Sequence, residues 1–399
     1  MKAYLHRKKK FYSRRVRAKN NGMLKKNLLK KDLGLFSKTI FLVNIVAVLL
    51  LLMSYAATII NPQTFWPLAF LGLGYLPILI INVTFVLYWL LRRPKVALFT
   101  IIPILLGWNL LSQHLGIRAK SDEITKTDGA LRVMTFNAHL FSKVKGKTTN
   151  DIKTQVAKLI EEVQPDLLTI QEYFSKIKGT KQFTDQILEQ GNFKEFIFEP
   201  AMQSEHEGYG QIIFSKYPIV YSGVITKNEF GINRIIFADI VKGRDTVRVY
   251  NVHLRSFGLQ SEDKAFIQNP STVPGDEQTT KKLGRKLKLA FERRGKQALA
   301  LREHIDTTRH PVIVMGDFND TPMSYSVNLI GKNLKNTFDE KGRGWGVTHY
   351  EMLPILQIDY IFCSKKFNVE KYKIIKEKLS DHYPVWSDIH LTNWGTSTD

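Results

Sequence analysis

Residues of the types that bind metal ions or move protons follow or interrupt short apolar segments throughout the last two thirds of the chain. In the apolar segment 247–254, alternation places Asn251 and His253 on the face that begins with valines. Polar residues also end, interrupt or flank apolar segments at Asn137, Glu172, Asp317, Asn319, Asp359, Asp381 and His382. Burying so many polar side chains costs free energy unless they pair or bind an ion, so we expect them to share one site.

These residue types define a coherent chemistry, the hydrolysis of a phosphate ester. Glu172 and Asp381 carry hard oxygen donors that suit Mg²⁺ or Mn²⁺. Asp317 could orient or deprotonate a water for in-line attack on phosphorus. His382, oriented by a carboxylate such as Asp359, would transfer a proton or stabilise charge. The expected metal would add Lewis-acid stabilisation of the transition state.

Asparagines and a second histidine complete the candidate set. Asn137, Asn251 and Asn319 could hold the attacking water or donate to the non-bridging phosphate oxygens. His253 could stabilise the negative charge that develops there. Each of these residues, taken singly, also fits an ordinary structural role, because Asn and Asp are common in turns after strands. Only their joint occurrence indicates a catalytic site.

The scaffold that must position these residues alternates β-type and helical segments. Many of the β-type segments are apolar on both faces, as expected for sheets that are covered on each side. The expected strands lie at 132–136, 166–171, 211–214, 235–241, 246–254, 312–315, 358–363 and 385–391, and the expected helices at 151–163, 182–190 and 281–306. The pattern predicts one α/β domain over residues 131–395, after a polar linker at 116–130. Within it, residues 255–280 predict a loop insertion.

In the order of these motifs the chain resembles the endonuclease/exonuclease/phosphatase superfamily over residues 131–392. The resemblance rests on seven blocks: Thr-Phe-Asn137, Ile-Gln-Glu172, residues 210–218, Asn251-Val-His253, Gly316-Asp-Phe-Asn319, residues 358–362 and Ser380-Asp-His382. It implies a four-layer α-β-β-α sandwich, in which two facing sheets carry helices on their outer sides. It also implies hydrolase activity on phosphoric ester bonds.

The resemblance further implies roles for individual residues. It makes Glu172 the main metal ligand, with Asn137 and Asp381 in the same metal group. It pairs the carboxylate of Asp359 with His382 and leaves open whether Asp317 or His382 activates the water, so these two are assigned jointly.

The chain departs from some family members beside the first motif. Ala138 and His139 follow Asn137, so the second acidic metal ligand that some nucleases of the family have there is absent. His139 is therefore a candidate substrate contact. Trp345 and His349 are two further candidates, because residues 344–349 lie where the family often has a substrate-side loop.

The first third of the chain predicts a membrane anchor. Residues 1–38 contain fourteen Lys or Arg and one acid, Asp32, in a chain whose net charge is +22. Three apolar segments follow, at 39–60, 66–91 and 96–115. Each has about the 20 residues that a membrane-spanning helix needs, so we expect three transmembrane helices within residues 39–115. Because Lys and Arg in short flanks stay cytoplasmic, the basic tail is expected inside and the α/β domain outside.

The sequence thus predicts a multi-pass cell-membrane protein that hydrolyses phosphoesters outside the cytoplasm with Mg²⁺ or Mn²⁺, as a phosphodiesterase or phosphatase. Its substrate would be a lipid headgroup, a small phosphoester or a nucleic acid, and membrane lipid is its expected partner; no protein partner is inferred. Two alternatives stay open, an extracytoplasmic nuclease and a catalytically silent domain that binds a phosphate ligand on a membrane scaffold. The basic helix expected at 281–302 fits phosphate or headgroup steering as well as a solvated face.

Overall fold

The computed structural model describes residues 34–118, 124–142, 146–176, 182–225, 232–268, 277–351 and 356–391. The expected basic tail, 1–38, therefore lies almost entirely outside the described residues, as do residues 119–123 of the expected linker and 392–395 of the expected domain. The chain divides into two units, Met1–Leu49 and Leu50–Asp399, and helix α2 (Leu35–Ala56) runs across the boundary between them.

Among the described residues, two helices are long and apolar enough to cross a membrane, α2 and α5 (Tyr75–Arg92). The expected third span does not form one helix of that length. Helix α6 (Pro94–Leu106) has 13 residues, and Gly107 separates it from the short α7 (Trp108–Ser112). Two of the three expected spans thus contain helices long enough to cross a membrane, and the third is divided at Gly107.

The break at Gly107 coincides with a contact from Tyr55 of α2. Tyr55 donates a hydrogen bond of 3.1 Å to the carbonyl oxygen of Pro103, in the turn where α6 ends. The tyrosine ring lies so close to Gly107 that a side chain there would overlap it. The second expected span is interrupted in a similar way, because Gly74 separates α4 (Pro67–Leu73) from α5.

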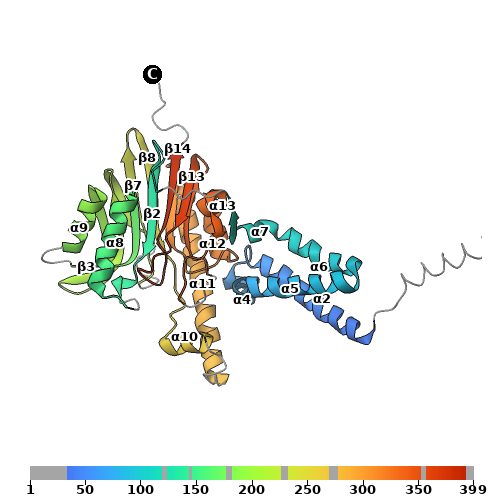
Figure 1. Cartoon of the computed structure of the whole chain (residues 1–399). Helices are drawn as coiled ribbons and strands as arrows, with labels where there is room; N and C mark the ends of the chain where they lie inside the picture. The colour runs from blue at the N-terminus through green and yellow to red at the C-terminus, as the bar shows by residue number, and fades with distance from the viewer. Residues whose placement is uncertain are drawn as a thin grey trace, which may run out of the picture. The chain divides into compact units, whose positions relative to one another are not determined.

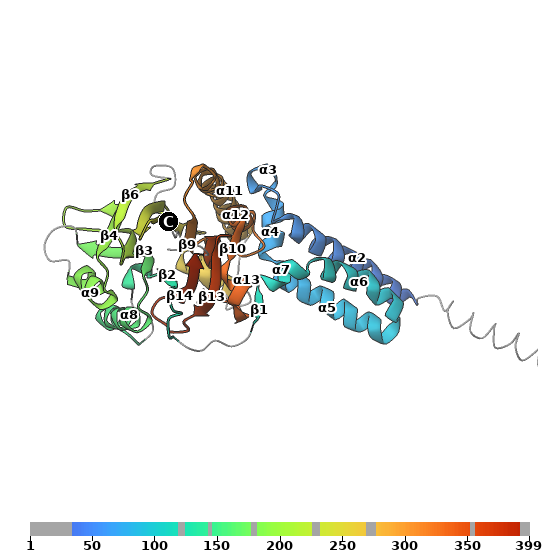
Figure 2. The ribbon, with the colours of Figure 1, turned by 90° about the horizontal axis from the view of Figure 1, so that it is seen from above.

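The α/β domain contains two sheets, each with six strands among the described residues (Figures 1 and 2). The strands of the first sheet are β2 (Leu131–Asn137), β3 (Leu167–Lys176), β4 (Glu195–Gln203), β5 (Glu207–Ser215), β13 (Phe367–Ile374) and β14 (Val385–Leu391). The strands of the second sheet are β6 (Ile219–Val224), β7 (Ile235–Lys242), β8 (Asp245–His253), β9 (Val312–Asp317), β10 (Leu334–Asn336) and β12 (Asp359–Ser364). Their orders are β13-β14-β2-β3-β5-β4 and β10-β12-β9-β8-β7-β6.

The two sheets face each other across an apolar core that includes Val133, Val249 and Ile313. Helices α8 (Thr149–Val163) and α9 (Gln182–Gly191) bury their apolar faces on the outer side of the first sheet, as Figure 1 shows. Helices α11 (Glu277–Thr307) and α12 (Tyr325–Gly331) cover the second sheet in the same way. The predicted α/β fold, with two facing sheets and outer helices, is confirmed.

The remaining elements are short. They are α3 (Pro62–Phe65), β1 (Leu115–Ile117), the 3₁₀ turn η1 (His139–Phe141), α10 (Ser261–Gln268), α13 (Thr337–Lys341) and β11 (Arg343–Trp345). Strand β1, at the start of the expected linker, pairs antiparallel with β11. Helix α10 lies inside the segment 255–280, which was expected to be a loop throughout.

The register of the strands explains why the candidate residues meet. Strands β2 and β3 are parallel, as are β8 and β9, so the carboxyl ends of each pair lie at the same sheet edge. On the second sheet His253 stands opposite Asp317, and Asp317 stands opposite Asp359 on the antiparallel β12. On the first sheet Asn137 stands opposite Gln171, the residue before Glu172.

Candidate active site

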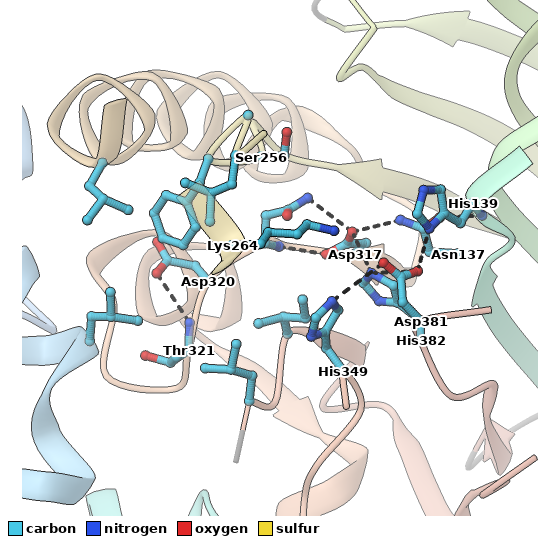
Figure 3. A pocket seen from close by; sticks show the side chains of 18 of the residues that line it. Asn137, His139, Ser256, Lys264, Asp317, Asp320, Thr321, His349, Asp381 and His382 are labelled. Atoms are coloured by element: carbon cyan, nitrogen blue, oxygen red, sulfur yellow. Dashed lines mark hydrogen bonds and ion pairs between the residues drawn. The ribbon is translucent and has the colours of Figure 1, made fainter. Parts of the chain in front are cut away.

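Most of the predicted residues line one cavity of about 400 Å³ at these strand ends (Figure 3). The predicted residues in its lining are Asn137, His139, Glu172, Asp317, Asn319, His349, Asp381 and His382. His253 and Asp359 are not in the lining but lie directly behind it, each within 4 Å of a lining residue. The structure thus brings together ten residues from widely separated parts of the sequence.

Asp317 is a carboxylate of the cavity that three hydrogen bonds hold in place. Its Oδ2 accepts hydrogen bonds from the amide nitrogens of Asn137 at 2.9 Å and Asn319 at 3.0 Å, and its Oδ1 accepts the backbone N–H of Asn319 at 2.7 Å. Burial raises the pKa of Asp317 to about 6, against the opposing effect of the nearby His382 charge. A carboxylate that is held in place and has a pKa not far below neutral pH is suited to accept a proton from water.

His382 and Asp359 form a buried pair. The Nδ1 atom of His382 lies 2.9 Å from Oδ2 of Asp359, and its Nε2 atom lies 3.8 Å from Oδ2 of Asp317. Burial alone would lower the pKa of His382, but the charges of Asp359 and Asp317 outweigh it and raise that pKa well above its usual value. The raised pKa favours the protonated form of His382, and its Nε2 lies on the side of Asp317.

His253 occupies a different position from His382. Its Nε2 atom lies 3.8 Å from Oδ2 of Asp317 and 3.7 Å from Oε1 of Glu172. The amide nitrogen of Asn233 lies 3.1 Å from the same Nε2. Burial lowers the pKa of His253 as well. His253 thus packs behind the carboxylates of Asp317 and Glu172, with its Nε2 atom toward both.

Glu172 is turned toward the cavity by an irregularity in its strand. The pairing of β3 with β5 shifts register between Ile170 and Tyr173, and Glu172 has a φ of 50°. Such bulges redirect a side chain and are common next to active sites. Burial raises the pKa of Glu172, an effect that the neighbouring histidine charges partly offset.

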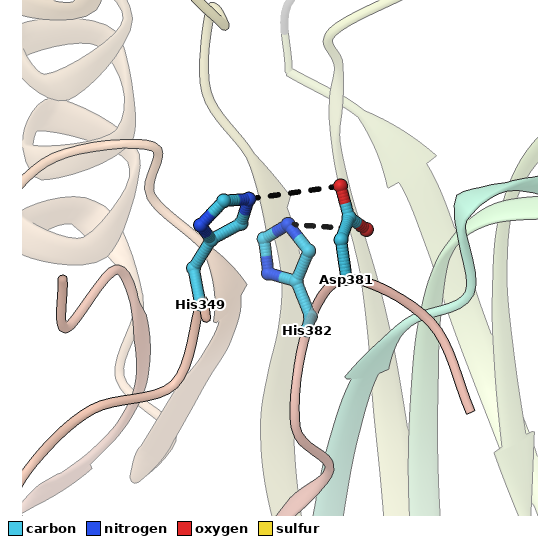
Figure 4. Close-up of side chains that lie close together, drawn as sticks. All are labelled: His349, Asp381 and His382. Atoms are coloured by element: carbon cyan, nitrogen blue, oxygen red, sulfur yellow. Dashed lines mark ion pairs between the residues drawn. The ribbon is translucent and has the colours of Figure 1, made fainter. Parts of the chain in front are cut away.

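Asp381 is held between two imidazoles. Its Oδ1 atom lies 2.9 Å from Nδ1 of His139 (Figure 3). Its Oδ2 atom lies 3.6 Å from Nε2 of His349 (Figure 4). Burial raises the pKa of Asp381, but the hydrogen bonds and charges of these histidines outweigh it and hold that pKa well below its usual value. Hydrogen bonding to Asp381 in turn raises the pKa of His139. Two candidate substrate contacts, His139 and His349, thus lie beside the carboxylate that was expected to bind metal.

Two predicted residues lie elsewhere. Asn251 is fully buried, donates to the carbonyl oxygens of Ile170 and Ile212, and accepts a 2.7 Å hydrogen bond from Nε2 of Gln171. Its amide therefore joins the two sheets beneath the cavity. Trp345 is half exposed in β11 and is not among the residues that line the cavity.

Sequence reasoning missed several residues that shape the site. Asn233 precedes β7 in a segment without a strand-end motif, so no local pattern pointed to its contact with His253. Thr348 accepts the backbone N–H groups of Ile358 and Asp359 and so fixes the start of β12. Only its position next to His349 could have drawn attention to it.

The donor atoms fit a divalent cation. Glu172, Asn137 and Asp381 all line the cavity, and the carboxylate oxygens of Glu172 and Asp381 are the ligand type that Mg²⁺ and Mn²⁺ prefer. The amide oxygen of Asn137 accepts the backbone N–H of His139 at 3.0 Å, which leaves its second lone pair for an ion. By distance alone, two other groups of described residues could hold an ion, His349–Asp381–His382 and Asp317–Asp359–His382. Both need His382 as a neutral ligand, whereas its pairing with Asp359 keeps it protonated. We therefore favour the oxygen donors.

A family model described as the Endonuclease/Exonuclease/phosphatase family matches residues 134–382, more than half of the chain. The chain belongs to that family. A second model, described as a domain of unknown function, matches residues 37–114. No curated protein sequence matches the chain.

Solved structures with similar folds include several members of the same family. A family protein from Beutenbergia cavernae is 20% identical, with 66% of this chain and 72% of that chain covered and a TM-score of 0.46. A mannosyl-6-phosphatase from Bacteroides thetaiotaomicron is 14% identical, with 65% and 99% covered and a TM-score of 0.47. D. rerio TDP2 complexed with a single-strand DNA product is 13% identical, with 66% and 100% covered and a TM-score of 0.45. At such identities these structures carry no argument about the substrate.

Proposed function

We propose that the chain is a divalent-metal-dependent hydrolase of phosphate esters. The observation that carries the proposal is the approach of the Asp317 carboxylate and the His382 imidazole to each other in the cavity. Oδ2 of Asp317 and Nε2 of His382 lie 3.8 Å apart, and each is held from behind, Asp317 by Asn137 and Asn319 and His382 by Asp359. Paired groups whose environments separate their proton affinities are typical of acid–base catalysis.

In this mechanism Asp317 orients the attacking water and accepts its proton as the new P–O bond forms. The imidazolium of His382 donates a hydrogen bond to the phosphate oxygens, and its proton is available to the leaving oxygen as the ester P–O bond breaks. Asp359 keeps His382 protonated and correctly turned. Asn319 keeps Asp317 oriented, and His253 acts as a positioning residue behind Asp317.

Glu172, Asn137 and Asp381 would hold the Mg²⁺ or Mn²⁺ ion. When bound, the ion supplies Lewis-acid stabilisation of negative charge on the phosphate. His139 and His349 flank Asp381 and are proposed substrate contacts. Trp345, outside the cavity lining, stays a proposed contact only for a part of the substrate that extends beyond the cavity.

We further propose that the chain is anchored in the cell membrane, with the active site outside the cytoplasm. The support is the length and apolar composition of α2 and α5 and the concentration of Lys and Arg before residue 39. Export of the α/β domain needs an odd number of crossings, so it depends on residues 94–112 crossing as a helix bent at Gly107. A reporter that is active only in the cytoplasm, fused after Asp399, should then give no signal; a strong signal means an even number of crossings or a reversed orientation.

The catalytic proposal is tested with the full-length chain purified in detergent. Phosphate monoesters and diesters of 4-nitrophenol should be hydrolysed with Mg²⁺ or Mn²⁺, and a chelator should abolish the reaction. A chain that binds these esters without turning them over would be a silent phosphate-binding domain instead. Undiminished hydrolysis in excess chelator would refute the metal-dependent mechanism.

A further inference from the structure

The cavity that holds the candidate catalytic residues has a second, apolar part. Its lining there comes from three places: the loop after β8, helices α10 and α11, and the end of α4. The apolar residues are Leu73, Phe257, Leu259, Ile267, Leu283 and Leu287. Figure 3 shows the catalytic side, with Asp317, His382, His349 and Asp381, and the other flank of the cavity near Ser256. One cavity therefore joins a polar reaction site to an apolar wall.

The apolar wall on α11 lies outside the apolar core that this helix forms with the second sheet. The core-facing side of this helix packs on the second sheet through Ala298, Leu301 and Ile305. Leu283 and Leu287 lie near the N-terminal end of the same helix, well before Ala298. They are spaced one turn apart, line the cavity and are half-buried. Side chains of this kind that cover no core are suited to contact a ligand.

The same wall adjoins the segment that leads into a candidate membrane span. The rings of Phe70 in α4 and Phe291 in α11 are 5.1 Å apart in an edge-to-face contact. Gly72 packs so closely against the backbone of Met323 that a side chain there would collide with it. Leu73, the last residue of α4, reaches the cavity lining, and only Gly74 separates it from α5.

The start of α11 carries the pattern of a helix that lies at a membrane surface. The leucines Leu283 and Leu287 stand among basic residues, which are Lys281, Lys282, Arg285, Lys286 and Lys288. Lys281, Lys282 and Arg285 are exposed, and the ammonium of Lys288 lies 5.2 Å from the ring of Trp66. An apolar stripe flanked by Lys and Arg binds the boundary between anionic headgroups and acyl chains.

We infer that the cavity takes an amphiphilic phosphate ester of the lipid class, with its phosphate at Asp317 and His382 and its hydrocarbon chain along Leu283, Leu287 and Leu73. The inference rests on the proposed function, since it names the substrate class of the same site. A sugar or nucleotide would leave its hydroxyl and base groups without partners against this wall, which costs binding free energy. A hydrocarbon chain loses no hydrogen bonds there and gains from burial.

The experiment compares esters that differ only in the chain. Methyl 4-nitrophenyl phosphate and dodecyl 4-nitrophenyl phosphate are offered, below micelle-forming concentrations, to the detergent-purified full-length chain with Mg²⁺; methyl and dodecyl phosphate serve if only monoesters react. We expect kcat/KM to be about tenfold or more higher for the dodecyl ester, since apolar burial is worth that much for a few buried methylenes. The variant Leu283→Gln/Leu287→Gln should reduce that preference by about tenfold.

A matched control separates the cavity from the rest of the helix. Leu289 is 44% exposed on the same helix and is not in the cavity lining, so Leu289→Gln should keep the wild-type preference. Equal rates for methyl and dodecyl esters, an unchanged preference in the double variant, or faster cleavage of a single-stranded oligonucleotide than of the dodecyl ester would overturn the inference while hydrolysis itself stands. Absence of hydrolysis of every ester would instead overturn the proposed function.

Discussion

The carboxylate of Asp359 and the imidazole of His382 form a buried pair in which Oδ2 lies 2.9 Å from Nδ1. The contact fixes which ring nitrogen faces the cavity and keeps the proton on His382. Replacing Asp359 by Asn removes the charge and should lower kcat and kcat/KM together by about 100-fold, the scale of one acid–base group. The loss should be greatest at high pH, because His382 without its partner is deprotonated earlier. A pH–rate profile that keeps its wild-type shape would contradict this pairing role.

Glu172, whose carboxylate lines the cavity, is the proposed main metal ligand. The variant Glu172→Gln keeps the volume but loses the charge, so we expect activity only at Mg²⁺ concentrations about tenfold higher or more, or no activity. The measurement is a Mg²⁺ titration of ester hydrolysis. Glu161→Gln, an exposed position on α8, is the matched control and should titrate like the wild type. Identical titrations for all three proteins would rule out Glu172 as a ligand.

Replacing Asn251 should affect the stability of the fold more than it affects catalysis. Its side chain satisfies two carbonyl oxygens and the amide of Gln171 where the sheets meet. Asn251→Ala leaves these buried groups without that partner and should lower the free energy of unfolding by on the order of 3 kcal/mol. Denaturant unfolding of the purified chain measures this. If instead Asn251→Ala melts like the wild type but has lost turnover, the residue acts in catalysis and not in joining the sheets.

Asp339 lies outside the candidate active site and should make the stability of the folded state depend on pH. Burial raises its pKa to about 7, against the hydrogen bond from Asn336. A carboxyl whose pKa is raised on folding stabilises the folded state most at low pH, and this contribution is lost as pH rises from about 4 through about 7. Asp339→Asn removes the titration, so its thermal midpoint should exceed that of the wild type more at pH 8 than at pH 5. Equal differences at both pH values would show that Asp339 titrates normally.

The strand-end residues could be predicted because the signal is local. An apolar run that ends in Asp, Asn, His or Glu is visible in the sequence, and parallel pairing of β2 with β3 and β8 with β9 then gathers those ends at one edge. Depth along a strand is less visible. Asn251 and His253 share a face by alternation, yet Asn251 lies two residues farther from the edge and is used inside the core.

Longer-range features could not be predicted. The hydropathy of residues 96–115 predicts a membrane span. Hydropathy contains no information on the contact between Tyr55 and Gly107, where α6 ends. The segment 255–280 has no strong periodicity, so α10 was missed, and with it part of the apolar wall. Helix α11 was predicted, but a one-dimensional pattern does not show which of its leucines face a sheet and which face a cavity.

The central claim is that Asp317 and His382 act as one unit on a phosphate ester, and a double-mutant comparison tests it most directly. Turnover of a 4-nitrophenyl phosphate ester with saturating Mg²⁺ is measured for Asp317→Asn, His382→Ala and the double variant, with thermal melts alongside. We predict that each single variant loses about 100-fold or more in kcat, that the double variant is little worse than the poorer single one, and that melting changes modestly. Near-normal turnover in both single variants, or losses explained by unfolding alone, would contradict the proposed site.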